Sequence, residues 1–303
     1  MARRIKLSHL DYFRAVGEAQ HVTKAAQNLG ISQPALSRAI ATLEAELGIP
    51  LFEHRRRSVR LTENGEVFLR YVERAFAVIE DGYEALNDLN EPGRGTIKIG
   101  FLRTLGYGFI PQLIRQFRIK YPDVQISLAQ NNSSGLEESM KNGDLDLIFV
   151  TQLADENACH SEKLASQDIH LVVPTNHRLA NRESVTLKEI KDEAFVCFKE
   201  GHALRDLFDR IFRSAGIEPN ISFECDDGSY LVGFVTAGLG IAFLPPNHGQ
   251  IEGTRSVKIA SPHARRDVVI AWPNNRYVNK STLAFMDFSK ASVGPDLTLD
   301  LSP

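Results

Sequence analysis

The sequence predicts an α/β protein built from a small, basic, mostly helical N-terminal part, one long helix, and a larger two-lobed α/β part. Length is the first reason, because 303 residues are about twice a typical single domain. The second is the apolar pattern, which changes along the chain from short helices, through one long helix, to alternating strands and helices. With 43% hydrophobic residues, the composition is that of an ordinary folded protein. No apolar run reaches the roughly 18 residues of a membrane span.

Charge is distributed unevenly along the chain. The net charge is -3 at pH 7, but residues 1–60 hold ten Lys and Arg against five Asp and Glu. The rest of the chain is therefore acidic, and we expect only the basic part to contact a polyanion. The N-terminus, MARRIKLSHLDYF, is basic but is not followed by an uninterrupted apolar segment and a cleavage site. This pattern favours a cytoplasmic protein.

The three cysteines, Cys159, Cys197 and Cys225, are widely spaced and include no CxxC pair. This spacing argues against a disulfide framework and against a thiolate metal site, and we expect no metal and no cofactor. Buried, unreactive thiols are the expected state. The alternative is a redox sensor in which Cys197 and Cys225, each predicted within a strand, form a switching disulfide.

The strongest local pattern is VTKAAQNLGISQPALSRAIATLEAELG, which predicts two helices joined by a tight turn. Thr23 is placed to cap the first helix, and Gly30 to end it in a left-handed conformation. Ser32 is placed to cap the second helix, with Pro34 in its first turn. The apolar residues of the second helix share one face, which we expect to be buried. They are Leu36, Ile40, Leu43 and Leu47.

The opposite face of the second helix is polar near its N-terminal end, where Gln33, Ser37 and Arg38 lie. A recognition helix presents this part to the major groove of DNA. Gln suits adenine and Arg suits guanine in bidentate geometry, while Ser37 suits a base or a phosphate. We therefore predict base contacts by these three residues. The predicted DNA-binding surface also includes residues at the helix starts, namely Thr23, Ser32 and Pro34.

A cluster of arginines, Arg55, Arg56, Arg57 and Arg60, follows on a predicted hairpin wing. A run of charge is by itself usually a solvated face. Beside a helix-turn-helix pattern, however, it favours neutralisation of DNA phosphates. We expect these contacts to supply affinity more than sequence specificity.

Residues 62–89 are predicted to form one long helix, because no proline interrupts the pattern before Pro92. Thr62 is placed to cap it, with Glu63 and Glu66 near the positive end of its dipole. Apolar residues recur at spacings of three and four, which favours packing along another helix and hence dimerisation. The alternative is a helix that lies on its own domain. The recurring residues are Phe68, Val72, Ala75, Ile79 and Leu86, joined by Tyr83.

Beyond a Pro/Gly hinge at residues 91–95, strands and helices alternate. The apolar runs TIKIGF, VQISLA and LDLIFV, separated by helices around 109–119 and 136–142, predict a parallel sheet. RDVVIAW predicts a late strand and STLAFMDFSK a late helix, which return to complete this first sheet. The chain would then pass from this lobe into a second one and back again, and a cleft would lie between the two lobes.

A second series of strands is predicted at DIHLVVP, AFVCF, ISFEC and GIAFLP. Helices are predicted between these strands, near residues 187–191, 203–215 and 228–238. This series forms the second of the two lobes.

Ligands of open α/β sheets bind outside the carboxyl ends of the strands, where helix N-termini direct backbone N–H groups into the crevice. In the first lobe the residues at this edge are Arg103, Thr104, Gln130, Asn131, Asn132, Ser133, Ser134 and Thr151. In the second lobe they are Phe198, Gly201, His202, Arg205, Asp226 and Asp227. Hydroxyls, amides and arginine at helix starts suit a carboxylate, which favours a small organic acid or amino acid as ligand. Ordinary helix capping explains Ser133, Ser134 and Asp226 equally well.

The N-terminal part of this pattern resembles a known family, and the α/β remainder has the length and strand order of that family's effector domain. The helix LSHLDYFRAVGEAQ, then VTKAAQNLGISQPALSRAIATLEAELGIPLFEHRRRSVRLTENG, then a linker helix are similar to the LysR-type transcriptional regulators. The resemblance covers essentially the whole chain. It implies a winged helix-turn-helix at residues 1–61, a linker and dimerisation helix at 62–91, and a periplasmic-binding-protein-like effector domain at 92–303. The implied lobes are lobe I, at about 95–164 and 268–303, and lobe II, at about 165–267.

The resemblance also implies a function and partners. The implied function is sequence-specific regulation of transcription under the control of a small-molecule effector bound between the lobes. The implied partners are double-stranded promoter DNA, the effector, and further copies of the chain in a homodimer or homotetramer. RNA polymerase is a further candidate partner, and no membrane is involved.

Enzymes are disfavoured by the sequence, and we predict no catalytic residues. No G-x-S-x-G elbow, Walker loop, H-E-x-x-H or Rossmann glycine pattern occurs. An acid/base group made of Asp226, Asp227 and His202 is an alternative, but adjacent carboxylates on a strand end point to opposite sides. A solute-binding protein for a transporter is another, which the basic helix-turn-helix pattern disfavours. The effector, the target genes and the sign of control are not encoded in any motif.

Overall fold

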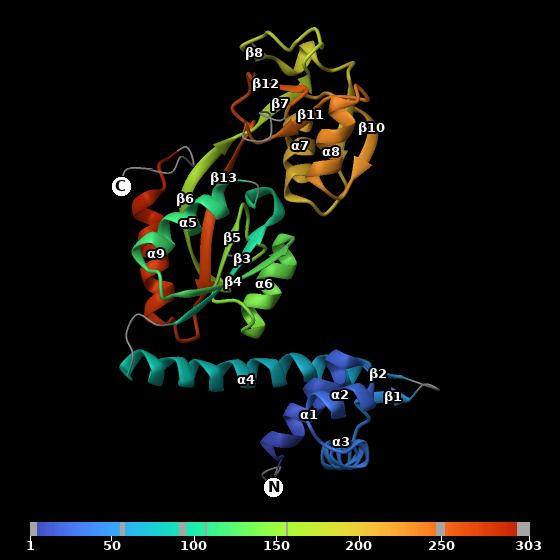
Figure 1. Cartoon of the computed structure of the whole chain (residues 1–303). Helices are drawn as coiled ribbons and strands as arrows, with labels where there is room; N and C mark the ends of the chain where they lie inside the picture. The colour runs from blue at the N-terminus through green and yellow to red at the C-terminus, as the bar shows by residue number, and fades with distance from the viewer. Residues whose placement is uncertain are drawn as a thin grey trace. The chain divides into compact units, whose positions relative to one another are not determined.

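The chain divides into two compact units, Met1–Tyr83 and Glu84–Pro303 (Figure 1). One helix, α4 (Glu63–Asn90), begins in the first unit and ends in the second. The predicted domain boundaries after residues 61 and 91 stay a prediction. The computed structural model describes residues 5–54, 58–90, 95–106, 108–155, 157–246 and 252–295.

The first unit is a three-helix module with a two-stranded antiparallel wing, and it confirms the predicted winged helix-turn-helix. Its core forms around Phe13, whose ring centroid lies 5.4 Å from those of Phe52 in the wing and Phe68 in α4. This aromatic cluster ties the wing and the long helix to the first helix. The elements before α4 are α1 (Leu7–Ala19), α2 (Val22–Asn28), α3 (Gln33–Leu47), β1 (Phe52–His54) and β2 (Val59–Leu61).

The predicted cap at Thr23 is wrong. The N-cap of α2 is His21, whose Nδ1 accepts a hydrogen bond from Lys24 N at 3.4 Å, and Thr23 lies inside the first turn. The reason is that α1 ends at a left-handed Gln20 (φ 48°), which leaves His21 in the extended conformation of a cap. Gly30 has the predicted positive φ of 66°.

Helix α3 begins as predicted, with Ser32 at the N-cap and proline in the first turn, although the Ser32 side chain makes no capping hydrogen bond. Its predicted inner face is confirmed, because Leu36 and Leu43 are fully buried. Ile40 is also buried, and Leu47 packs against the same core while partly exposed.

Helix α4 has the predicted cap and length. Thr62 Oγ1 accepts from Gly65 N at 3.0 Å and donates to the Pro50 carbonyl at 2.9 Å. In the first half of the helix, Phe68 and Val72 pack on the core of the first unit. Other apolar side chains of α4 are exposed, so the helix lies on its own domain only in part, and dimerisation through the exposed residues stays a prediction. The most exposed are Tyr71, Val78, Tyr83, Leu86 and Leu89.

The first lobe of the second unit is built on a five-stranded sheet of order β4-β3-β5-β13-β6. The predicted parallel arrangement holds for the first three of these strands, but β13 and β6 are antiparallel to their neighbours, so the sheet is mixed. The late strand and helix do return to this lobe as predicted. The strands are β3 (Thr96–Leu102), β4 (Gln125–Asn131), β5 (Leu147–Val150), β6 (Cys159–Asp168) and β13 (Arg265–Pro273). The helices are η1 (Arg103–Leu105), α5 (Phe109–Lys120), α6 (Ser133–Asn142) and α9 (Lys280–Ser292).

The second lobe combines a four-stranded sheet, β11-β7-β12-β8, with a parallel pair, β9 and β10. Its core gathers around Phe195, whose ring lies 5.1 to 5.7 Å from three other phenylalanine rings. The predicted helix near 187–191 is wrong in kind, because a single turn of 3₁₀-helix, closed by a capping box at Thr186, forms there. The strands are β7 (His170–Pro174), β8 (Ser184–Val185), β9 (Ala194–Phe198), β10 (Asn220–Cys225), β11 (Ala242–Leu244) and β12 (Thr254–Ile259). The helices are η2 (Leu187–Glu189), α7 (Ala203–Ser214) and α8 (Gly228–Thr236).

Two long strands, β6 and β13, connect the lobes and pair with each other along their whole length (Figure 1). β6 was not predicted, because its sequence CHSEKLAS is polar and exposed over much of its length. No helix among the described residues is both long and apolar enough to cross a membrane.

Gly65 and Gly82 of α4 provide a matched pair for testing the packing of this helix. A Cβ at Gly65 would lie 2.1 Å from the Leu51 carbonyl oxygen, whereas a Cβ at Gly82 would meet nothing within 4 Å. We expect Gly65→Ala to lower the free energy of unfolding by at least about 2 kcal/mol through overpacking. Gly82→Ala should raise it by about 1 kcal/mol through helix propensity. Urea unfolding at one protein concentration measures both, and equal effects of the two changes would contradict this packing.

Candidate functional site

Helix α3 presents a small polar surface at its N-terminal end. Gln33 Nε2 donates to Ser37 Oγ at 2.9 Å, and Arg38 Nε donates to the Pro34 carbonyl at 3.3 Å. Gln33 and Arg38 are exposed and Ser37 is half-buried. The structure therefore brings the predicted base-reading residues together on one face. Thr23, on α2, and Ser32 are exposed as well.

The wing is attached to the same helix. Glu44 of α3 accepts hydrogen bonds from the backbone N–H groups of Leu51 and Phe52, at 2.7 and 3.0 Å, where the wing begins. Arg60 is exposed on β2 opposite Glu53. The predicted residues Arg55, Arg56 and Arg57 lie outside the described residues.

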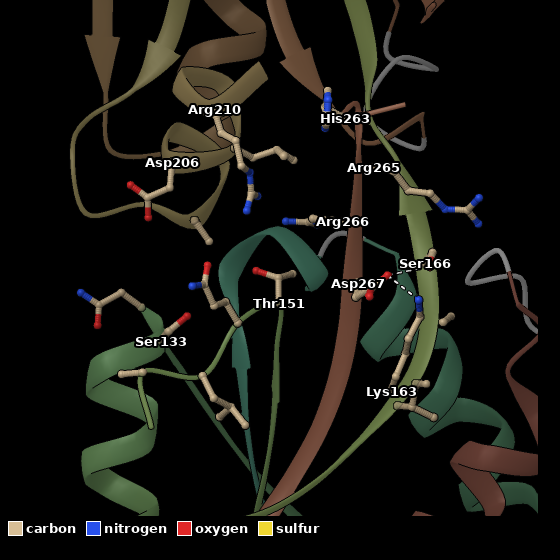
Figure 2. Close-up of a pocket in the computed structure, with 18 of the residues that line it drawn as sticks. Ser133, Thr151, Lys163, Ser166, Asp206, Arg210, His263, Arg265, Arg266 and Asp267 are labelled. Atoms are coloured by element: carbon tan, nitrogen blue, oxygen red, sulfur yellow. Dashed lines mark hydrogen bonds and ion pairs between the residues drawn. The ribbon is translucent and has the colours of Figure 1, made fainter. Parts of the chain in front are cut away.

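A cavity of about 1140 Å³ lies between the lobes, beside the crossing strands β6 and β13 (Figure 2). Of the residues predicted to bind a ligand, Asn132, Ser133, Ser134, Thr151 and Gly201 line this cavity. A smaller pocket of about 140 Å³ nearby shares Asn132 and Gly201 with it. Its other predicted residues are Arg103, Thr104, Asn131 and His202.

Five predicted ligand residues lie outside both cavities, and most have structural partners. Gln130 lines a separate groove beside α5. Buried Arg205 forms ion pairs with Asp209 and Glu224 and donates to the Phe198 carbonyl at 3.0 Å. These contacts hold α7 against β9 and β10, which explains why Arg205 and Phe198 face the core of the lobe.

The two adjacent aspartates point to different partners, as expected for neighbours at a strand end. Asp226 pairs with Lys199 at 2.5 Å and lies 3.7 Å from His202 Nε2. Asp227 caps α8 by accepting from Ser229 N at 2.7 Å. This capping role, and the absence of both aspartates from the lining of the large cavity, argue against the acid/base alternative.

The residues that the sequence interpretation missed come mainly from β6, β13 and α7. The prediction placed ligand residues only at the carboxyl ends of strands, whereas β6 contributes residues from its interior and β13 contributes residues from its start. The charged pair Arg266 and Asp267, which opens the predicted strand RDVVIAW, was the sequence signal that could have indicated them. The missed ionisable residues are Glu137, Lys163, Asp206, Arg210, His263, Arg265, Arg266 and Asp267, with Ser166 beside them.

Arg266 is a buried cation with uncharged partners. It is 5% exposed, and its Nε and Nη2 donate to Gln167 Oε1 at 2.9 and 2.6 Å. Nη1 donates to Thr104 Oγ1 at 2.9 Å. Burial lowers the pKa of Arg266 to about 9, which still leaves the guanidinium charged at neutral pH. Because no acidic side chain among the described residues pairs with it, its charge is uncompensated within that part of the chain.

The crossing strands also carry a pair of opposite charges that neutralise each other. Asp267 pairs with Lys163 at 2.8 Å and accepts from Ser166 Oγ at 2.7 Å. Although burial alone would raise the pKa of Asp267, the contacts with Lys163 and Ser166 lower it below its ordinary value. Lys163 is therefore not the cation best placed to meet an added anion.

The first lobe contributes hydroxyl and backbone groups to the cavity. Asn132 caps α6 by accepting a hydrogen bond from Gly135 N at 2.9 Å. Because Asn132 also lines the cavity, the start of this helix lies at the cavity wall. Buried Glu137 accepts from Ala154 N at 3.0 Å and holds the segment after β5. In Figure 2, Ser133 and Thr151 face the cavity from this lobe.

The three cysteines are buried and free. Burial raises the pKa of all three thiols, that of Cys197 to about 11. A thiol with such a pKa holds almost no thiolate at neutral pH, and thiolate is the reactive form.

Comparison with known proteins identifies this combination of domains. Residues 7–66 match the family described as "Bacterial regulatory helix-turn-helix protein, lysR family", and residues 90–294 match "LysR substrate binding domain". The chain belongs to the LysR family. It is a LysR-type transcriptional regulator with a helix-turn-helix domain and an effector-binding domain.

Curated relatives of this LysR-type regulator span more than nine-tenths of its length. The uncharacterized HTH-type transcriptional regulator YybE of Bacillus subtilis (strain 168) is 41% identical over 280 residues, covering 92% of this chain and 96% of that protein. The transcriptional dual regulator GltC of the same organism is 35% identical over 288 residues, covering 94% and 96%.

Solved structures give the same fold. CbnR, a LysR family transcriptional regulator, superposes with a TM-score of 0.74 at 21% identity, covering 94% of this regulator and 98% of CbnR. The effector-binding domain of QuiR, in complex with shikimate, is 26% identical with a TM-score of 0.59, covering 65% of this chain and 96% of that one.

The buried thiols lead to a prediction about redox chemistry. We expect the native regulator to resist modification by iodoacetamide at pH 7.5 and to form no Cys197–Cys225 disulfide in peroxide, because the thiols are buried and protonated. Mass spectrometry of native and urea-unfolded protein measures both reactions, with the unfolded chain as the positive control. A peroxide-dependent disulfide in native protein, absent from Cys197→Ser, would revive the redox alternative.

Proposed function

We propose that this regulator binds promoter DNA sequence-specifically through α3 and the wing, and that a small carboxylate in the inter-lobe cavity controls it. The observation that carries the effector half is the buried, uncompensated charge of Arg266. An isolated buried ion costs several kcal/mol unless it is paired. A carboxylate ligand would provide that pairing.

Hydrogen-bond geometry supports a carboxylate more specifically. A guanidinium has five N–H donors. Gln167 and Thr104 take three of those of Arg266. Within the described part of the chain, one N–H on Nη1 and one on Nη2 have no acceptor, and both can donate to the oxygens of a carboxylate.

The rest of the cavity wall suits the same ligand class. Ser133 and Thr151 offer hydroxyl donors, and the start of α6 carries the positive end of a helix dipole. Shikimate, which is bound in the QuiR structure, is itself a carboxylate. We infer a small organic acid or amino acid as the effector.

The DNA-binding half is supported by the polar end of α3. We propose that Gln33, Ser37 and Arg38 contact bases and that Arg60, with the neighbouring wing arginines, contacts phosphates. One of the CbnR structures is a complex with its target DNA.

We also propose that the regulator is a homodimer or homotetramer that pairs through α4. The support is the exposed apolar surface of this helix, on which Tyr71 is 63% and Leu86 57% exposed. Apolar residues at such spacing pack well against a second helix. We propose, finally, that the regulator acts in the cytoplasm and catalyses no reaction.

Arg38 and Arg60 separate base reading from phosphate contact. We expect Arg38→Ala to weaken binding to the selected operator by about 1 to 3 kcal/mol with little effect on random DNA. Arg60→Ala should weaken binding to both DNAs alike and reduce the salt dependence. The operator comes from selection of genomic fragments by the purified protein, and fluorescence anisotropy at several salt concentrations gives the affinities. Equal losses on both DNAs for both variants would contradict the assigned roles.

Arg266 tests the effector proposal. We expect carboxylates such as shikimate, lactate and succinate to raise the melting temperature of the full chain, and their amides to have no effect. Arg266→Met should weaken carboxylate binding by about 10- to 100-fold, as expected for loss of a charge-assisted contact. Arg213→Met, which removes a cation of α7 that does not line this cavity, is the control and should bind normally. Since Arg266→Met could perturb folding, Arg266→Lys provides a second test, with charge retained but bidentate geometry lost. Unchanged binding by both Arg266 variants would refute the assignment.

A further inference from the structure

We propose that Arg210 of lobe II supplies a second guanidinium to the carboxylate held by Arg266, so that one anionic group is bound from both sides of the cleft. This inference rests on the proposed effector site. It assigns a specific ligand-binding residue to the second lobe. The second-lobe residues predicted from strand ends include no cation that lines the large cavity.

The position of Arg210 follows from the packing of α7. Leu207, Phe208 and Ile211 are buried in the core of lobe II and fix the rotation of the helix. Asp206 and Arg210, one turn apart, consequently lie on the face that lines the cavity. Figure 2 shows Arg210 extending from α7 into the cavity that Arg266 enters from β13.

The charges around Arg210 leave it available to an anion. Lys163 and Asp267 neutralise each other at 2.8 Å, and Glu137 accepts a backbone hydrogen bond. Arg265 lies 3.7 Å from Asp168. The remaining ionisable side chains of the lining are those of Asp206 on the same helix and His263 before β13. Arg210 itself forms no ion pair within 4.0 Å with any residue that the structure describes, although Asp206 is one turn away.

Two guanidiniums that enter one cavity without acidic partners repel each other, and a shared anion converts this repulsion into two attractions. A carboxylate has about four lone-pair sites and can accept from both groups at once. Arg266 belongs to the crossing strand β13 and Arg210 belongs to lobe II. An anion bound by both would therefore also hold lobe II against the crossing strands. Occupancy of the site would favour approach of the lobes.

Arg213 provides a matched control. It lies on the same helix, three residues further on, but lines a separate groove with Phe212 and Pro219. Arg210→Gln and Arg213→Gln remove the same charge from the same helix, so that a general electrostatic effect would appear in both. If Arg210 contacts the anion directly, only Arg210→Gln should weaken anion binding.

The experiment measures binding of shikimate, lactate, succinate and inorganic phosphate to the full chain by calorimetry. We expect Arg210→Gln to weaken binding of the best carboxylate by about 10-fold or more, and Arg213→Gln to change it by less than about 2-fold. The double variant Arg210→Gln/Arg266→Met should bind little worse than Arg266→Met alone, because the two residues act on one group.

Each other outcome overturns a defined part. If Arg210→Gln behaves like Arg213→Gln while Arg266→Met loses binding, the role of Arg210 is refuted and the proposed effector site stands. If Arg266→Met also binds normally, or if no carboxylate binds the wild type, the proposed effector site fails together with this inference. Tighter binding of phosphate than of every carboxylate would overturn the carboxylate class.

Discussion

The buried charge of Arg266 is the constraint on which the second unit depends. It lies where β6 and β13 cross between the lobes, held by Gln167 of one crossing strand and Thr104 of the first lobe. Both partners are uncharged, and burying a cation in such surroundings costs several kcal/mol. The fold tolerates this cost beside a large cavity, which is the expected arrangement if the position serves an anionic ligand rather than stability.

The first unit obeys a different constraint, the close packing of the long helix on the wing. Gly65 allows the first turn of α4 to approach the Leu51 carbonyl, and Thr62 caps that turn while holding the Pro50 carbonyl. Glu44 joins the same segment to the recognition helix. The polar end of α3 and the wing are therefore held in a fixed relation, as recognition of a groove with its flanking phosphates requires.

Helix α4 is anchored at its other end as well. Asp88, 4% exposed, accepts hydrogen bonds from Tyr277 Oη at 2.9 Å and from Lys280 N, at the start of α9, at 2.7 Å. This contact raises the pKa of Tyr277. One continuous helix is thus attached to the core of the first unit through Val72 and to the first lobe through Asp88. A regulator needs such a connection between the domain that binds DNA and the domain that binds an effector.

The sequence by itself determined the helix-turn-helix, the long helix and most of the strands and helices, because these follow from local periodicity and from residues that end or cap helices, such as Gly30 and Thr62. It also located Ser133 and Thr151, since strand ends of one sheet meet at one edge. Local patterns misplaced the cap at Thr23 and missed β6. Only the tertiary structure brought Arg266 together with a hydroxyl 162 residues away in sequence. The reason is that β13 enters the sheet of the first lobe by pairing with strands far away in sequence, and no short stretch of sequence encodes such long-range pairing.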